Sequence, residues 1–213
     1  MDTGNSAARI CGICAKNEGA DVALTILEVD GERRQLLVTM EQYMDLKIRK
    51  GEILTDERIE AIEEASALCG ALRCGENLLA FAPAPTHALA RKIAQHGHKR
   101  EVSLKAATEL SQRGLIDEAA MIRREVQKCA RKYWGGRRIR SYLWTRGYGK
   151  EALETLDDLL LDIEFSDLCT ELLKKKCGRL PDDPEERKKL KAKLVRYGYT
   201  PEEIRTAFEN LSH

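Results

Sequence analysis

The sequence predicts a mainly α-helical protein: three tandem three-helix repeats forming an elongated curved body, preceded by a small N-terminal β-hairpin-containing module. Three glycines, 50 and 51 residues apart, each follow an aliphatic residue by four positions and precede a ring residue. Apolar residues also recur eight positions before and nine positions after each glycine. Such a shared period predicts repeats. The three sets are Ile93-Gly97-His98, Leu143-Gly147-Tyr148 and Leu194-Gly198-Tyr199.

The N-terminal module differs from the repeats. Two apolar, β-branched segments, 22–29 and 35–39, flank Asp30-Gly31, which is a hairpin signal. A two-stranded ribbon is only marginally stable alone, so we expect it to pack on helices or to pair with a partner. The sequence then looks helical from Met40 to Lys50. We expect residues 1–20 to form a mobile tail and residues 21–54 the strand-containing module.

The third repeat carries the clearest helix signals. Asp183 and Pro184 suit the N-cap and first position of a helix, and Leu190, Leu194 and Val195 predict one buried stripe along it. Gly198 ends this helix in a Schellman turn, and a capping box at Thr200 starts the next. With a preceding helix in each unit, we expect about nine repeat helices. The repeats are expected to span residues 55–114, 115–161 and 162–213.

Composition excludes several classes of protein. Charged residues make up 33% of the 213-residue chain and aromatic residues only 5%, which suits helices with a large solvated surface. No run of 18 apolar residues is present, so we expect no membrane span. The first residues lack the charged-then-apolar pattern of a signal peptide. These features predict a cytoplasmic protein that does not bind membranes.

The seven cysteines are best explained as reduced thiols, several of them inside apolar helical patterns. Cys11 and Cys14 have the spacing of a zinc knuckle, but the available mates, Cys69 and Cys74, have the wrong spacing and read as helical. We therefore expect no metal site and a reduced N-terminal tail.

No catalytic constellation is visible. His96 and His98 are two residues apart at a turn, Gly135-Gly136 lacks the Walker spacing and its Lys-Ser/Thr, and no Gly-x-Ser-x-Gly occurs. The adjacent acids Asp157 and Asp158 diverge on a helix. The sequence predicts a protein that is not an enzyme and that has no cofactor and no small-molecule substrate.

The near-zero net charge of +1 conceals strong charge blocks. Residues 121–150 hold ten Lys or Arg against one acid, residues 151–173 hold eight acids and no base, and residues 174–196 hold ten bases against four acids. One interpretation is that acidic and basic helices pair between repeats as solvated faces. The other is that the basic blocks bind a polyanion or an acidic protein groove.

Residues around the second glycine sharpen the second interpretation. Arg137, Arg138 and Arg140 fall in the first turn of a helix, where positive charge opposes the macrodipole and an anionic partner would relieve the cost. Aromatic residues interleave with these arginines, as they do in some base-stacking surfaces: Tyr133, Trp134, Tyr142 and Trp144. For Trp144, however, packing is the better explanation, because it adjoins core Leu143 and matches Val195 of the third repeat.

The same residues resemble a known family. The stretch 114–118, then Gly136-Arg-Arg-Ile-Arg140 with Leu143 and Arg146-Gly-Tyr148, resembles the central signature of the RecX regulatory proteins. The segments 180–187, 194–199 and 203–205 are similar to that family's third repeat. The resemblance covers roughly residues 55–212 and is weakest in the first repeat. There the family's Ser/Thr-x-x-Glu-Leu signature has lost its Glu, and its aromatic residue is replaced by His98.

This resemblance implies a non-enzymatic modulator of the RecA recombinase. RecX proteins are curved helical-repeat bodies that lie in the groove of the RecA–ssDNA filament, block its extension and favour its disassembly, which restrains recombination and the SOS response. The partner-binding residues expected here act by electrostatic docking. They are Arg123, Arg124, Lys128, Arg131, Lys132, Arg137, Arg138, Arg140, Arg146, Lys188, Lys189, Lys191, Lys193 and Arg196.

Two other hypotheses remain open from the sequence. The helix–glycine–helix units could bind nucleic acid directly without a recombinase, and weak non-specific DNA binding fits both this hypothesis and the RecA modulator. A generic protein-interaction solenoid also fits the repeat pattern, and only the RecX motifs argue against it.

Overall fold

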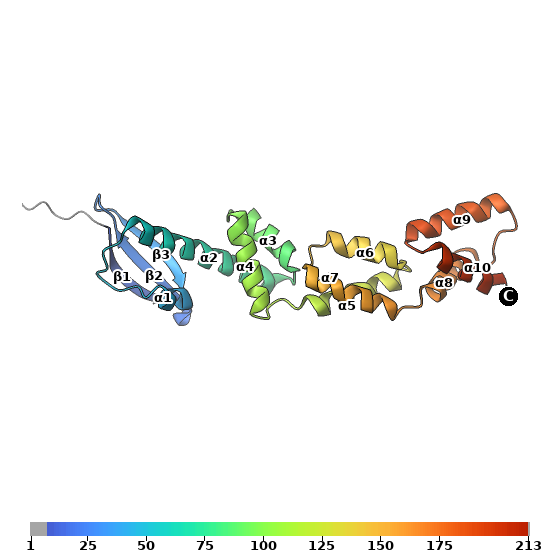
Figure 1. Cartoon of the computed structure of the whole chain (residues 1–213), viewed down its shortest axis with the longest axis horizontal. Coiled ribbons are helices and arrows are strands. Elements are labelled where there is room, and N and C mark those ends of the chain that lie inside the picture. The colour runs from blue at the N-terminus through green and yellow to red at the C-terminus, as the bar shows by residue number, and fades with distance from the viewer. Residues whose placement is uncertain (1–7, 213) are drawn as a thin grey trace, which may run out of the picture. The chain divides into compact units, whose positions relative to one another are not determined.

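The computed structural model describes residues 8–212 and shows a mainly helical chain with a small sheet at its N-terminal end (Figure 1). It divides into two compact units. Of the described residues, the first unit contains 8–84 together with 89–115, and the second contains 85–88 together with 116–212. The expected fold class, tandem helices after a small β module, is confirmed.

The sheet has three antiparallel strands in the order β1-β2-β3. These are β1 (Arg9–Lys16), β2 (Asp21–Leu27) and β3 (Arg33–Thr39). The predicted hairpin is β2–β3, with Gly31 at φ 88° in its turn. The expectation of a mobile tail over residues 1–20 is wrong from Arg9 onward, and residues 1–7 lie outside the described part of the chain. The reason is that β1 pairs with the free edge of β2 from Arg9↔Leu27 to Lys16↔Asp21, supplying the pairing that a two-stranded ribbon lacks.

The sheet is stabilised by a helix that packs on it. Ile10, Leu24, Ile26 and Val38 are fully buried together with Ile62 of α2 (Asp56–Phe81). Burying such side chains contributes about 1.5–3 kcal/mol each. In the chain, the short α1 (Met40–Asp45) follows β3 and precedes α2; it opens with a capping box and ends earlier than the sequence predicted.

The remaining helices follow the predicted grouping in threes. The first group is α2 with α3 (Thr86–Gln95) and α4 (Arg100–Gln112). The second is α5 (Glu118–Arg131), α6 (Gly136–Thr145) and α7 (Lys150–Leu161). The third is α8 (Phe165–Cys177), α9 (Pro184–Tyr197) and α10 (Pro201–Ser212).

The three periodic glycines end the middle helix of each group. Gly97, Gly147 and Gly198 have φ of 95°, 85° and 97°, a region that side chains other than glycine rarely adopt. The aliphatic residues four positions earlier are all buried. At the third glycine, the amide of Tyr199 donates to the carbonyl of Leu194 at 3.3 Å, which confirms the predicted Schellman ending.

Candidate partner-binding surface

Within the second unit, the second and third helix groups meet backbone to backbone. The amide of Gly135 donates to the carbonyl oxygen of Tyr197 at 2.8 Å, and the amide of Arg137 donates to that of Gly198 at 3.2 Å. The approach is so close that a Cβ on Gly135 would lie 2.4 Å from the carbonyl carbon of Gly198. The start of α6 is therefore joined head to tail to the end of α9.

This junction corrects one electrostatic argument from the sequence. Arg137 and Arg138 do lie in the first turn of α6. However, two amides at this helix start already have partners, the terminal carbonyls of α9, whose partial negative charge offsets the positive end of the α6 dipole. The arginines thus sit where two opposite helix ends meet, and the dipole alone does not require an anionic ligand.

The same bond recurs one repeat earlier in the chain. The amide of His87, in the part of α3 that belongs to the second unit, donates to the carbonyl of Gly147 at 3.1 Å. His87 and Arg137 are 50 residues apart, and Gly147 and Gly198 are 51 apart. Pro85 takes the place of Gly135 and has no amide to donate. Instead, the carboxylate of Glu118 accepts from the amides of Thr86, at 2.6 Å, and Gly149, at 2.9 Å.

Cations and rings alternate around the α6–α9 junction, and we call this group the junction cluster. The guanidinium of Arg138 lies 4.1 Å from the ring centre of Trp134 and 5.5 Å from that of Tyr197. Lys132 covers Trp134 at 5.6 Å, and Lys176 covers Tyr197 at 5.1 Å. The ammonium of Lys176 holds the pKa of Tyr197 below its usual value. These contacts fix the positions of several positive charges at one place.

The structure places the predicted binding residues on the surface. All of them are exposed except Arg138, which is half-buried in the junction cluster. Three of them are neutralised in part by ion pairs: Lys128 with Glu125, Arg140 with Asp157, and Lys188 with Glu185. Within the described part of the chain, the others form no ion pair; among these, Arg123, Arg124, Arg131 and Arg137 also have no ring contact.

The alternative interpretation, pairing between acidic and basic blocks, finds little support in these contacts. Across residues 8–212, one ion pair joins the basic block 121–150 to the acidic block 151–173, and it is Arg140 with Asp157. Both of its side chains are more than half exposed, so it contributes little stability.

Trp144 corrects the sequence interpretation that it packs in the core. Its side chain is 71% exposed, and its counterpart in the third repeat, Val195, is 49% exposed. Each directly follows a buried leucine, Leu143 or Leu194, so the next residue points about 100° further around the helix and leaves the core. Helical periodicity counted from these leucines could have revealed this exposure.

The structure also bears on the cysteines and on the candidate metal and membrane features. Cys11 is half-buried and Cys14 exposed on β1, whereas Cys129 and Cys169 are buried as expected. Among residues 8–212, no cluster of three or more His, Cys, Asp or Glu side chains is placed to hold a metal ion. None of the described helices is long and apolar enough to cross a membrane.

Comparison with known proteins finds a family match in the third helix group. Residues 162–208, which span α8, α9 and most of α10, match the family model described as RecX, third three-helix domain. The third helix group is similar to the third domain of RecX proteins. The matched range includes the glycine turn that ends α9, where the head-to-tail junction forms.

Solved RecX structures share the fold. A crystal structure of a regulatory protein RecX superposes with a TM-score of 0.71 at 19% identity, covering 95% of this chain and 99% of the other. A crystal structure of RecX from Lactobacillus salivarius gives 0.59 at 18% identity, covering 70% of this chain and 98% of that one.

Proposed function

We propose that this protein is a non-enzymatic regulator of a RecA-type recombinase. It binds the RecA–ssDNA filament and inhibits recombinase activity by blocking filament extension and favouring disassembly. The match of residues 162–208 to the third three-helix domain of RecX supports a role in RecA regulation. The proposed docking surface is made of the basic side chains on α5, α6 and α9.

The observation that carries this proposal is the set of exposed cations without internal partners. Arg123 and Arg124 on α5, Arg137 on α6, and Lys189 and Arg196 on α9 make no ion pair among the described residues. Unpaired like charges on one unit repel each other, and an acidic partner surface removes that cost. Such complementarity mainly accelerates association and selects the partner.

Exposed apolar side chains add to this surface. Trp144 and Val195 occupy equivalent positions on α6 and α9, one turn or two from the basic residues of their own helices. Tryptophan surrounded by polar residues is typical of binding hot spots. We therefore assign Trp144 the role of an apolar anchor beside the electrostatic contacts.

Direct DNA binding is the second candidate function, and the junction cluster favours it. Arg138, Lys132 and Lys176 are held near aromatic rings and form no ion pair in the part of the chain that the structure describes. Positively charged grooves with aromatic residues are common in proteins that bind single strands. Binding by this cluster alone would require no recombinase.

A filament-binding experiment separates the two candidates. The cognate recombinase is assembled on single-stranded DNA with a slowly hydrolysed ATP analogue, and the fluorescently labelled protein is titrated into filament, free recombinase or free DNA. Our proposal predicts binding to the filament that is much tighter than binding to DNA alone. Equal affinity for naked DNA and filament would support the second candidate instead.

Charge variants then locate the surface. Arg123→Glu with Arg137→Glu is expected to weaken filament binding, because both side chains are exposed and unpaired. Arg138 is left intact, since it stacks on Trp134. The matched control, Arg33→Glu with Lys50→Glu, changes the net charge equally at exposed positions of the first unit. If both double variants bind alike, the assignment to α5 and α6 is wrong.

A further inference from the structure

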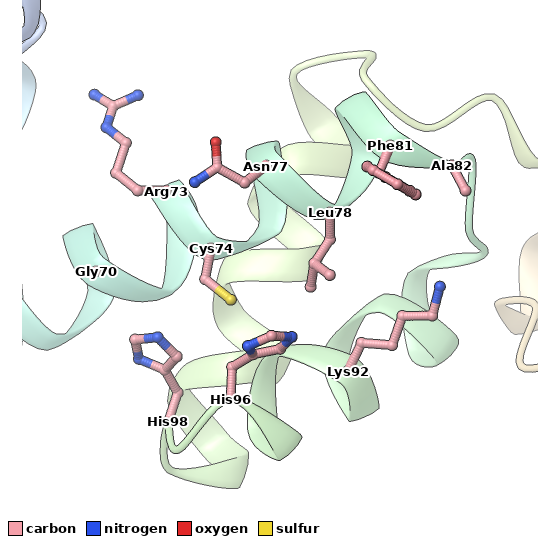
Figure 2. Close-up of a pocket in the computed structure, with 10 residues that line it drawn as sticks. All are labelled: Gly70, Arg73, Cys74, Asn77, Leu78, Phe81, Ala82, Lys92, His96 and His98. Atoms are coloured by element: carbon pink, nitrogen blue, oxygen red, sulfur yellow. The ribbon is translucent and has the colours of Figure 1, made fainter.

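A hollow of about 620 Å³ lies beside the first glycine turn, inside the first unit. One wall is the C-terminal half of α2, and the other is the end of α3 with the turn at Gly97. Figure 2 shows Cys74 and Leu78 of α2 facing the imidazoles of His96 and His98, while Arg73 points away from them. The size is in the range of pockets that hold ligands.

The hollow occurs where this repeat departs from the other two. Tyr148 and Tyr199 follow the second and third glycines and are buried, so each fills the equivalent position with a large ring. In the first repeat this residue is the smaller His98, which is only half-buried. It lies against Gly70, where a Cβ would be 3.3 Å from the imidazole Cε1.

The lining combines hydrogen-bond donors with apolar surface. Lys92 is exposed and forms no ion pair within residues 8–212, and the imidazoles and the Asn77 amide can donate hydrogen bonds. None of the residues that the structure places in the lining is acidic. Arg73 does not add a free charge, because it donates to Asp21 at 2.9 Å and to Glu76 at 2.6 Å.

The apolar part of the site is open to solvent. Phe81, at the end of α2, is 96% exposed at the rim, next to Leu78 and Ala82. A fully exposed phenylalanine beside a cation suits a segment carried on the surface of another protein, which would cover the ring while a carboxylate meets Lys92. An enclosed pocket would instead suit a small molecule.

We infer that this hollow binds an acidic peptide segment of a protein partner, with a carboxylate at Lys92 and the histidines and an apolar side chain against Leu78 and Phe81. The inference does not rest on the proposed recombinase function, since the site is in the first unit and uses none of the basic residues of α5, α6 and α9. Charge complementarity and the exposed ring support it.

Titration calorimetry with a capped acidic peptide containing Asp, Glu and Leu tests this directly. The same peptide with Asn and Gln in place of the acids is the charge control. Lys92→Gln is expected to weaken binding of the acidic peptide about two- to fivefold, the range for a partly exposed ion pair. Lys105→Gln, which removes an exposed lysine of α4 outside the lining, should leave binding unchanged.

A filling variant provides a second readout. His98→Tyr restores the residue type of the other two repeats, and it should occupy the hollow and reduce peptide binding while the protein stays folded. The inference is overturned if the acidic peptide does not bind at millimolar concentration or if the neutral peptide binds equally well. It is also overturned if Lys92→Gln and Lys105→Gln give the same affinity.

Discussion

The amide of Gly135, just before α6, donates a hydrogen bond of 2.8 Å to the carbonyl oxygen of Tyr197, the last residue of α9. These residues are 62 positions apart in the sequence. Together with the bond from Arg137 to Gly198, this contact makes the end of one repeat helix the cap of another. It also positions the junction cluster, because Arg138, Trp134 and Tyr197 flank the joined backbones.

Gly135→Ala is therefore expected to destabilise the protein by about 1–3 kcal/mol, the usual cost of forcing a methyl group into a filled space. The added Cβ would lie 2.4 Å from backbone atoms of Gly198, which cannot move aside as a side chain can. Urea denaturation measures the change. Gly136→Ala is the matched control, since its Cβ meets only the ring of Phe165, at 3.2 Å. An equal loss of stability in Gly135→Ala and Gly136→Ala would contradict a backbone junction at Gly135.

Tyr199→Phe tests a side-chain hydrogen bond near this junction. The Tyr199 hydroxyl donates to the carbonyl oxygen of Tyr133 at 2.9 Å, and the ring is fully buried. Removing the hydroxyl leaves that carbonyl without its donor, so we expect a loss of about 1–2 kcal/mol in urea denaturation.

The matched control is Tyr148→Phe. Tyr148 is buried at the equivalent position of the second repeat, and burial raises its pKa to about 12, but its hydroxyl makes no hydrogen bond within the described residues. Tyr148→Phe should lower the free energy of unfolding by no more than about 0.5 kcal/mol. A larger loss for Tyr148→Phe than for Tyr199→Phe would argue against the assigned bond.

Much of this fold was predictable because its signals are local. Glycine turns, capping residues and apolar periodicity act within a few positions, so the nine repeat helices seen within residues 8–212 and the β2–β3 hairpin follow from the sequence. Strand β1 was missed because its evidence is not local: the segment is stabilised by pairing with β2, and a sequence without an alignment does not show that pairing.

The candidate site was predictable only in part. Charge blocks correctly placed Arg123, Arg124 and Arg137 on the surface, because charged side chains are rarely buried unpaired. The role of Gly135, by contrast, depends on a contact with Tyr197 that no local pattern encodes. The prediction that Trp144 is packed is wrong, because adjacency to a core leucine does not imply burial: neighbours on a helix point in different directions.

Trp144→Ala is expected to weaken filament binding with little effect on folding. The side chain is 71% exposed, so its removal should change the free energy of unfolding by less than about 0.5 kcal/mol. An interface hot spot costs about 2 kcal/mol or more on truncation, equivalent to a roughly 30-fold weaker dissociation constant. Binding is measured by fluorescence anisotropy on assembled filaments.

Trp134→Ala serves as the comparison for Trp144. Trp134 packs against the core of the second repeat and stacks edge-on with Tyr142 at 5.3 Å, so its loss should lower stability. If Trp144→Ala binds filaments as well as the unchanged protein does, Trp144 is not an anchor.

Lowering the pH should reduce the stability of the first unit, because the Asp21 carboxylate becomes protonated. This carboxylate is fully buried and accepts from Arg73 at 2.9 Å and from Asn17 at 2.5 Å. Burial raises the pKa of Asp21, but the hydrogen bonds from Arg73 and Asn17 and the charge of Arg73 outweigh it, so the pKa lies below its usual value. A depressed folded-state pKa gives stability that is present above the unfolded-state pKa and lost as the pH falls.

Asp21→Asn is expected to cost about 2–3 kcal/mol at pH 7, somewhat less than a sealed buried pair because Arg73 is 30% exposed. As the pH falls from about 5 to about 2, the free energy of unfolding of the Asp21→Asn variant should also decrease less than that of the unchanged protein. Urea denaturation across this window measures both effects. An identical acid dependence in the two proteins would show that the Asp21–Arg73 pair is not the source.

The most direct test of the proposed function is ATP hydrolysis by the cognate RecA recombinase on single-stranded DNA, with this protein titrated in below one molecule per recombinase. Blocked filament extension predicts that steady-state hydrolysis falls strongly at such substoichiometric amounts, because each bound molecule stops the growth of many recombinase subunits. Unchanged hydrolysis, with binding to DNA intact, would contradict the account and favour a direct DNA-binding protein.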